Sequence, residues 1–191
     1  SGGLVPGWGV DEAGIWRVAV AGGEPVKVAG GFGAPHFGAS NDRIFANGQA
    51  SGKQTLVSMD LNGEARRTHA GGEMASDFRV SPDGTAMTFR QNYEAHVMPL
   101  LPGPQDVPAD ARATALPVVR ASVGGADYIG WSADGRTLTW SNGATFFRAD
   151  KAQLFAAAPA AKDAPKFAAP TSGVLMAMEV PADKPAGTIA L

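Results

Sequence analysis

The chain has 191 residues, 45% of them hydrophobic and 18% charged, which suits one domain with a buried core. Sixteen basic and eighteen acidic residues give a formal net charge of −2 without a basic run, which argues against nucleic acid and anionic membrane surfaces as partners. The absence of cysteine excludes disulfides, thiolate nucleophiles and cysteine metal sites. No apolar run approaches the roughly 20 residues of a membrane-spanning helix.

The first predicted element is a β-hairpin near the N-terminus. Two strand-like runs, 15–21 and 24–30, flank a Gly-Gly pair, and glycine pairs favour reversals between strands. The run 16–22 aligns with 57–63 further along the chain, at an offset of 41 residues. We therefore expect this hairpin to recur.

The second copy of the hairpin centres on Asn62-Gly63, a dipeptide typical of two-residue reversals. It predicts a strand over 56–61 that returns over 64–69. Just before it, Gly48–Gln54 resembles a phosphate-binding loop, but its glycines are one residue too close together and Gln54 stands where Ser or Thr should be. We interpret this segment as a hairpin loop.

One longer motif occurs three times. It consists of an apolar or aromatic residue, a short polar turn and two apolar residues spaced two apart. The copies begin at Phe37, Val80 and Trp131, so their offsets are 43 and 51 residues. Because residues two apart face the same side of a strand, each copy predicts a strand, a reversal and a second strand. A repeat of about 40–50 residues is the size of a propeller blade.

The turn inside this motif reads Ser-x-Asp-Gly in the second and third copies. Asp83 and Asp134 can accept hydrogen bonds from backbone N–H groups two residues on, while Gly84 and Gly135 can adopt positive φ. In the first copy Asn41 takes the place of the glycine, and we expect it to adopt the left-handed conformation. Turn chemistry accounts for both aspartates, so a calcium-binding or catalytic role is the less favoured interpretation.

These patterns predict an all-β fold, a partial β-propeller of about three to four antiparallel four-stranded blades. The blades occupy residues 1–150. Phe37, Val80 and Trp131 are expected at equivalent inner positions, and no amphipathic helix is expected before residue 150.

Three segments depart from the blade pattern. Residues 99–117 carry five prolines, which cannot donate to a β-ladder, so we expect an insertion that runs over the surface in extended form. The alanine- and proline-rich residues 151–172 predict a surface connector, with a short helical turn over 152–157 as the alternative. Residues 173–191 contain a strand-like run, 173–180, and are expected to begin a junction to a downstream domain.

Few residues are arranged for catalysis. The three histidines, His36, His69 and His96, are not spaced to place two imidazoles on one metal ion, and no Gly-x-Ser-x-Gly nucleophile elbow occurs. We therefore predict hydrogen-bonded structural or surface roles for all three. We assign no catalytic, cofactor-binding or metal-binding residue, and expect neither hydrolase activity nor a cofactor.

The three copies resemble the TolB-like (WD40-like) family of β-propeller repeats, whose blades read aromatic-Ser-Pro-Asp-Gly-Lys/Arg followed by an apolar pair. The runs 81–84 and 131–136 fit this pattern well, whereas the copy at Phe37 lacks both the aspartate and the glycine. The likeness covers roughly residues 10–150. It implies a propeller but leaves function open, because such propellers occur in periplasmic Tol components, in prolyl-oligopeptidase-type peptidases and in other fusions.

The C-terminal residues 180–191 resemble the junction between a TolB-like propeller and an imidazolonepropionase-like amidohydrolase domain in large bacterial proteins. In this resemblance 187–191 is similar to the first strand of the metal-dependent hydrolase, and 140–148 to the last propeller blade. The family's catalytic residues, a His-x-His pair among them, would follow Leu191. None is carried over onto this chain.

Three functions are compatible with the sequence. The resemblance favours a non-catalytic propeller segment of an exported amidohydrolase-like protein, acting as scaffold, substrate gate or interaction surface. The alternatives are the accessory propeller of a prolyl-oligopeptidase-type serine peptidase and a free-standing TolB-like protein-binding module. The first implies a periplasmic or secreted location, a parent with metal-dependent hydrolase activity, and a downstream hydrolase domain or a second copy of the chain as partner. The chain starts at Ser1 rather than at methionine, so any export signal is expected upstream.

Overall fold

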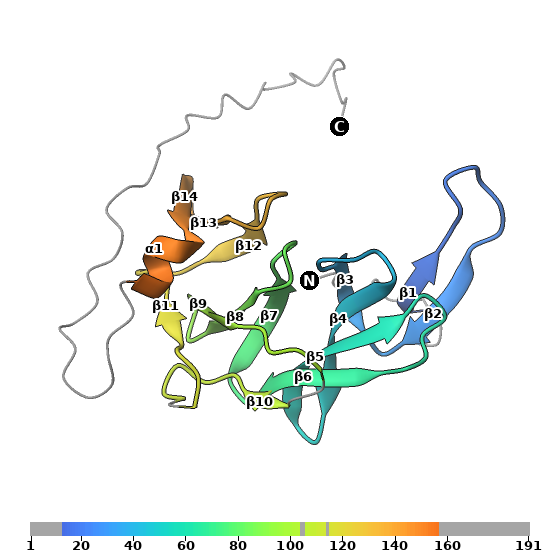
Figure 1. The fold of residues 1–191 in the computed structure, drawn as a ribbon, viewed down its shortest axis with the longest axis horizontal. Helices are drawn as coiled ribbons and strands as arrows, with labels where there is room; N and C mark the ends of the chain where they lie inside the picture. The colour runs from blue at the N-terminus through green and yellow to red at the C-terminus, as the bar shows by residue number, and fades with distance from the viewer. Residues whose placement is uncertain (1–12, 104–105, 114, 157–191) are drawn as a thin grey trace, which may run out of the picture.

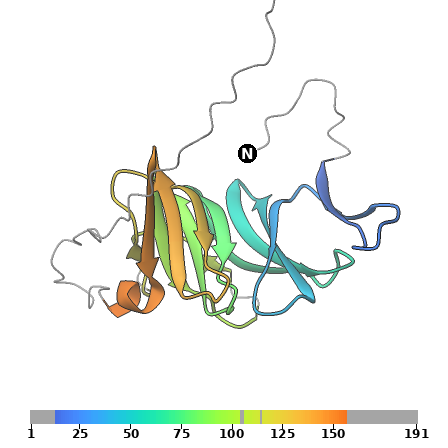
Figure 2. The ribbon, with the colours of Figure 1, turned by 90° about the horizontal axis from the view of Figure 1, so that it is seen from above.

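The computed structural model describes residues 13–103, 106–113 and 115–156, which form fourteen strands and one short helix. The strands belong to four sheets that stand side by side in a curved array (Figures 1 and 2). The described part of the chain is therefore all-β apart from one helical turn and a half. The sheets are successive blades of a partial β-propeller, as the sequence predicts.

A hairpin precedes the first complete blade. Its antiparallel strands are β1 (Gly14–Arg17) and β2 (Val26–Gly30). The predicted hairpin is confirmed, but its strands are shorter than expected, and residues 18–25 connect them instead of the Gly-Gly pair alone. Val18 and Val20 in this connection are exposed, so no packing against the core stabilises longer strands there.

The first blade is antiparallel throughout its four sequential strands: β3 (Gly33–Phe37), β4 (Arg43–Ala50), β5 (Lys53–Asp60) and β6 (Arg67–Gly72). The hairpin loop predicted at Gly48–Gln54 is confirmed, because Ser51 and Gly52 turn the chain between β4 and β5 with φ of 50° and 77°. The turn at Asn62-Gly63 is confirmed as well, with Gly63 at φ 83°.

The second blade has four strands in the order β11-β9-β8-β7, where β7 (Ala75–Val80), β8 (Ala86–Gln91) and β9 (Glu94–Pro99) are consecutive and β11 (Val119–Arg120) is outermost. The proline-rich segment 99–117 therefore lies between the third and fourth strands of this blade. It does more than run over the surface, because β10 (Val107–Pro108) pairs in parallel with β6 of the first blade. Pro108 is tolerated there because β10 is an edge strand.

The third blade contributes three described strands, β12 (Asp127–Trp131), β13 (Thr137–Asn142) and β14 (Thr145–Asp150). The helix α1 (Lys151–Ala156) follows directly, so the helical alternative replaces the start of the predicted connector. Leu154 is only 4% exposed, which shows that this turn is packed against the blades. The predicted segments 157–172 and 173–191 lie outside the described residues. No helix in the described part has the length and apolarity needed to cross a membrane.

The predicted equivalence of Phe37, Val80 and Trp131 is confirmed. Each is the last residue of the innermost strand of its blade, and each pairs with the apolar residue seven positions later: Ile44, Met87 and Leu138. Their environments differ, because Val80 is buried between blades whereas Phe37 is 48% exposed.

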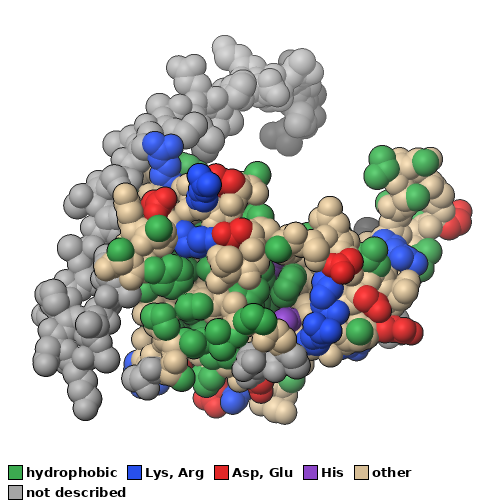
Figure 3. All heavy atoms as spheres, in the orientation of Figure 1, with side chains coloured by type: hydrophobic (Ala, Val, Ile, Leu, Met, Phe, Trp, Pro, Cys, Tyr) green, Lys and Arg blue, Asp and Glu red, His purple; other side chains and the backbone are tan. Residues whose placement is uncertain are grey.

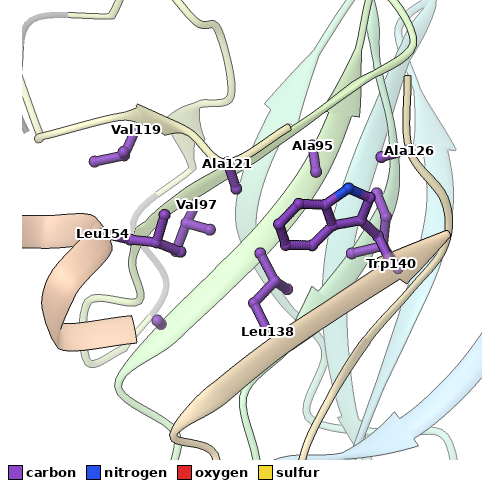
Figure 4. Packing of buried hydrophobic residues seen from close by; sticks show 10 residues of the cluster. Ala95, Val97, Val119, Ala121, Ala126, Leu138, Trp140 and Leu154 are labelled. Atoms are coloured by element: carbon purple, nitrogen blue, oxygen red, sulfur yellow. The ribbon is translucent and has the colours of Figure 1, made fainter. Parts of the chain in front are cut away.

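Apolar side chains fill the spaces between successive sheets. Between the second and third blades, Trp140 and Leu138 of β13 face Ala95 and Val97 of β9, and Leu154 of α1 closes one side (Figure 4). Two further clusters fill the spaces on either side of the first blade. Small residues on one sheet thus oppose large ones on the next, which lets the blades approach closely.

The Ser-x-Asp-Gly turns pack blade against blade. Gly84 and Gly135 have φ of 69° and 70°, as predicted. A Cβ atom on Gly84 would meet the Cβ of Ala39 at 2.9 Å, and one on Gly135 would meet the backbone nitrogen of Asp83 at 2.9 Å. Each glycine therefore serves both its own turn and the close approach of the preceding turn.

The side chains of these turns hold the predicted hydrogen bonds. Asp83 accepts from the backbone N–H of Thr85 at 3.2 Å and Asp134 from that of Arg136 at 3.0 Å. The prediction for Asn41 is wrong, because its φ is not positive. In the first copy Gly38 takes the position of Ser81 and Ser132. A hydrogen bond from Ser40 to Asp42 organises its turn instead.

We predict that Gly135→Ala destabilises the protein more than Gly143→Ala. Both glycines have positive φ, so each alanine costs about 1 kcal/mol of unfolding free energy, but only Gly135 lies against a neighbouring turn. The added contact is expected to cost roughly 1 kcal/mol or more in addition. Urea unfolding of both variants measures the difference. Equal losses would show that the turns do not depend on one another.

Candidate binding surface at the inner strands

The three inner strands share one backbone irregularity. The pairing register shifts between Gly33 and His36 in β3, and at the matching places in β7 and β12. Each shift contains one non-glycine residue in the left-handed region: Ala34 (φ 52°), Asp77 (φ 52°) and Tyr128 (φ 51°). These residues repeat at the 43- and 51-residue offsets of the blades. The bulge is therefore a repeated property of the inner strand.

The three bulge residues are all exposed, although their side chains have nothing in common. A left-handed conformation costs an L-residue roughly 1–2 kcal/mol, and such outliers persist only where the surroundings enforce them. The surface formed by β3, β7 and β12 thus presents a different side chain from each blade on the same backbone geometry. We call it the inner-strand surface.

Side chains of the first blade bind backbone groups of β7, one residue inside its bulge and one just after it. The Asn47 amide accepts a hydrogen bond from the N–H of Phe78 at 2.7 Å and donates to its carbonyl at 3.2 Å. Nε2 of His36 accepts from the N–H of Val80 at 2.9 Å. Because unpaired backbone groups are costly when buried, these contacts fix the second blade against the first.

Charged side chains join the second blade to the third. Arg90 of β8 contacts Asp77 at 2.7 Å and Asp127 of β12 at 3.1 Å. These carboxylates are more than half exposed, so the pairs add little stability but hold the orientation of the side chains.

A second ionic contact lies at the Ser-x-Asp-Gly turn of the second blade. Lys151 binds Asp83, donates to the hydroxyl of Thr85 at 2.8 Å and lies 5.8 Å from the ring centre of Trp131. Burial acts to raise the pKa of Asp83, but hydrogen bonds from Lys151, Ser81 and Thr85 prevail and hold it well below its usual range. The first residue of α1 is thereby tied to the neighbouring blade.

The three histidines lie on different strands and are held in place by hydrogen bonds or ring contacts. Nδ1 of His36 lies 3.0 Å from the carbonyl of Ala34, which with its accepting Nε2 defines a neutral ring. His96 lies 3.1 Å from the carbonyl of Glu94 and stacks on Phe89 at 5.2 Å. Burial lowers the pKa of all three histidines. At His36 and His96 the carbonyl contacts oppose this lowering without cancelling it.

His69 and Ser58 superficially resemble a base and nucleophile, since His69 Nε2 lies 2.7 Å from Ser58 Oγ. Arg43, however, donates two hydrogen bonds to the same oxygen, at 3.0 and 3.2 Å, so the hydroxyl proton is directed to the ring. Ser58 is fully buried, and the buried Nδ1 of His69 has no hydrogen-bond partner. Burial, and after it the charge of Arg43, lowers the pKa of His69, and the carbonyl of Gly103 opposes this lowering only in part. These hydrogen bonds indicate a structural role for Ser58 and His69.

A cavity of 290 Å³ lies where the insertion meets the first two blades. Lys53, Glu73, Asp110 and Arg112 give its walls both signs of charge. Gln91 accepts a hydrogen bond from the N–H of Ala111 at 2.6 Å and thereby anchors the insertion beside the cavity. Among the described residues no group of three or more His, Asp or Glu side chains is placed to hold a metal ion.

Comparison with known proteins adds little beyond this description. No protein-family model matches the chain, and no curated protein matches it. Among solved structures, it is similar to the β-propeller domain of the Trilobed protease from Pyrococcus furiosus, described as having an open velcro topology (19% identity, TM-score 0.40, covering 64% of this chain and 40% of that one). It is also similar to Pyrococcus horikoshii acylaminoacyl peptidase (17% identity, TM-score 0.38, covering 64% of this chain and 23% of that one). The chain therefore spans less than half the length of either structure, and the likeness carries no argument about function.

Sequence reasoning did not find the inner-strand surface. The three residues, Ala34, Asp77 and Tyr128, share no chemical type. Only the aspartate belongs to a residue class that is enriched at positive φ. The only signal was positional, because each residue stands three before the start of its motif copy at Phe37, Val80 or Trp131.

We predict that the protein loses stability as pH falls from 7.5 to 5.5. Because the folded histidines have lowered pKa values, the unfolded chain binds protons below about pH 6.5 while the folded chain resists them, so the free energy of unfolding decreases. Urea unfolding at several pH values measures the slope. The variant His36→Gln, which cannot titrate, is expected to have a shallower slope. A flat wild-type profile, or an unchanged slope in the variant, would contradict the neutral-histidine assignment.

Proposed function

We propose that this chain is a non-catalytic binding and scaffolding segment of a β-propeller, and that the inner-strand surface is the part that contacts a partner. The observation that carries the proposal is the repeated bulge. Three inner strands keep the same costly backbone while the exposed residue changes from Ala34 to Asp77 to Tyr128. A constant scaffold with varied exposed side chains is the arrangement that recognition requires.

The inter-blade contacts support this role. Asn47 and His36 hold β7 from the first blade, and Arg90 reaches Asp127 on the third. A surface whose positions are fixed before binding loses little conformational freedom when a partner arrives. The closed Ser58–His69 network supports the non-catalytic half of the proposal, since Arg43 occupies the oxygen that a nucleophile would use.

At a finer level, we propose that the segment is TolB-like and belongs to an exported amidohydrolase-like protein, in the periplasm or secreted. The support is the sequence resemblance of the Ser-x-Asp-Gly blades and of residues 180–191, which lie outside the described residues. In such a protein the inner-strand surface would serve as a scaffold or substrate gate for the hydrolase domain.

Peptide selection tests the binding role. Random peptides displayed on phage are selected on the immobilised chain and then bound to the double variant Asp77→Ser, Tyr128→Ser. We expect binding to fall at least tenfold, because both substitutions remove exposed inner-strand side chains. The control is Arg148→Gln on β14, which is exposed and belongs to no inner strand. Undiminished binding by the double variant would contradict the binding surface. Stoichiometric zinc that is lost on substitution of His36, His69 or His96 would contradict the non-catalytic role.

We also propose that the isolated chain self-associates through its β1–β2 hairpin. Trp16 and Val26 there are 48% and 51% exposed, whereas the last described blade presents Thr139 and Arg148 on paired strands. Apolar surface at one end of a blade array favours pairing of that end with another copy. Light scattering over a range of concentrations is expected to reveal a dimer, and Trp16→Ser to weaken it. A monomer at every concentration would refute this proposal.

A further inference from the structure

Large exposed hydrophobic side chains gather at one end of the second and third blades. Four of the nine such side chains in the described residues lie there: Met74 (65% exposed), Tyr93 (82%), Val123 (50%) and Tyr128 (92%). We call these four residues the aromatic rim. On the face in Figure 3, Lys, Arg, Asp and Glu side chains are mixed over β12–β14, and hydrophobic side chains cover much of the area over β8, β9 and β11.

Strand register places the aromatic rim at a single end of the blades. Ala75 pairs with Gln91, and Gln91 with Glu94, so the loops that carry Met74 and Tyr93 are neighbours. The N–H of Ala126 donates to the carbonyl of Tyr93 at 2.8 Å, which brings the start of β12 to the same loop.

Both rim tyrosines occupy backbone that disfavours them. They are the only two tyrosines of the chain, and they have φ of 67° (Tyr93) and 51° (Tyr128). Positive φ is a clear outlier for a bulky residue and suits glycine far better. Rings that are 82% and 92% exposed contribute almost nothing to the core. Packing therefore gives no reason for an aromatic side chain at either position.

The loops that carry the rim are fixed by hydrogen bonds. Glu94 accepts from the hydroxyl of Ser122 and, at 2.8 Å, from the N–H of Gly124. Ser122 Oγ in turn accepts from the N–H of Ala95 at 2.8 Å, and Asn142 donates to the carbonyl of Gly124 at 2.8 Å. Val123 and the start of β12 are thus anchored to two neighbouring hairpins, so the rim is organised in advance of any contact.

The ion-paired group beside Tyr128 has more acidic than basic members. Asp77 and Asp127 flank the single guanidinium of Arg90, and their side chains are 52% and 60% exposed. Two carboxylates against one cation leave an excess of negative charge next to Tyr128. Tyrosine faces also attract cations, so the rings and the carboxylates favour the same kind of ligand.

We propose that the aromatic rim binds a basic, extended segment of a partner protein, with Lys or Arg side chains over Tyr93 and Tyr128 and near Asp127. The inference rests on the proposed function, because Tyr128 belongs to both surfaces. It adds the chemical class of the partner. Aromatic side chains that are rigidly presented on a polar surface are typical anchors of protein interfaces.

A matched pair of peptides tests the class of partner. Two fluorescein-labelled decapeptides have leucine at every second position. The positions between are arginine in one peptide and glutamate in the other. Fluorescence anisotropy with the full chain is expected to give at least tenfold tighter binding of the arginine peptide, weakening as salt increases. Equal or tighter binding of the glutamate peptide would overturn the proposal.

Substitution of the tyrosines separates recognition from folding. The double variant Tyr93→Gly, Tyr128→Gly is expected to bind the arginine peptide at least tenfold more weakly, while its Tm is unchanged or higher because glycine relieves the positive-φ strain. The variant Tyr93→Phe, Tyr128→Phe keeps the rings and should bind like wild type. Arg148→Gln, an exposed substitution on β14 that belongs neither to the rim nor to the β1–β2 hairpin, is the control and should not weaken binding. Undiminished binding by the glycine variant, or a fall in its Tm, would overturn the proposal.

The two proposals fail in distinguishable ways. If phage-selected peptides require Asp77 and Tyr128 but the arginine peptide does not bind, the inner-strand surface stands and the basic partner is wrong. If neither the selected peptides nor the arginine peptide depends on these residues, both proposals are wrong.

Discussion

The close approach of neighbouring blades is the constraint on which the rest of this structure depends. The turns that follow the inner strands lie so near to one another that Gly84 and Gly135 have no room for a Cβ atom. The same proximity lets Asn47 and His36 of the first blade hydrogen-bond to the backbone of β7. Because those backbone groups would otherwise be unpaired, the second blade depends on the first. The bulges, the neutral histidines and the turns are separate consequences of this contact.

Rigidity and exposure are combined at the same end of the blades. Glu94 gathers the loop around Ser122, and Arg90 links Asp77 to Asp127. These polar contacts add little stability because most of them are solvent-exposed. Their effect is on position, since they hold Tyr128 and its neighbours in a backbone conformation that the residues would not choose alone. The strained backbone conformations therefore occur where side chains are presented to solvent.

The insertion between β9 and β11 illustrates the limit of reasoning from composition. Prolines in 99–117 predicted an extended surface insertion, since proline has no N–H to donate to a ladder. They did not exclude an edge strand, and β10 pairs in parallel with β6 of the preceding blade. Similarly, alanine-rich composition obscured α1, whose Leu154 is buried against Val97 and Val119 (Figure 4). In both cases a long-range partner decided the outcome, and local sequence carries no record of that partner.

The sequence by itself determined the blade repeat, the inner positions of Phe37, Val80 and Trp131, and the turn chemistry of Ser-x-Asp-Gly, because strand alternation and turn geometry act over a few neighbouring residues. Only the tertiary structure decided that Ala34, Asp77 and Tyr128 share one bulge, that β10 joins another blade, and that Tyr93 lies beside the start of β12. These features arise from contacts between residues on different strands or blades, often many tens of positions apart in sequence. The backbone conformation at such sites is imposed by the neighbouring blade, so the residue type at the site does not reveal it.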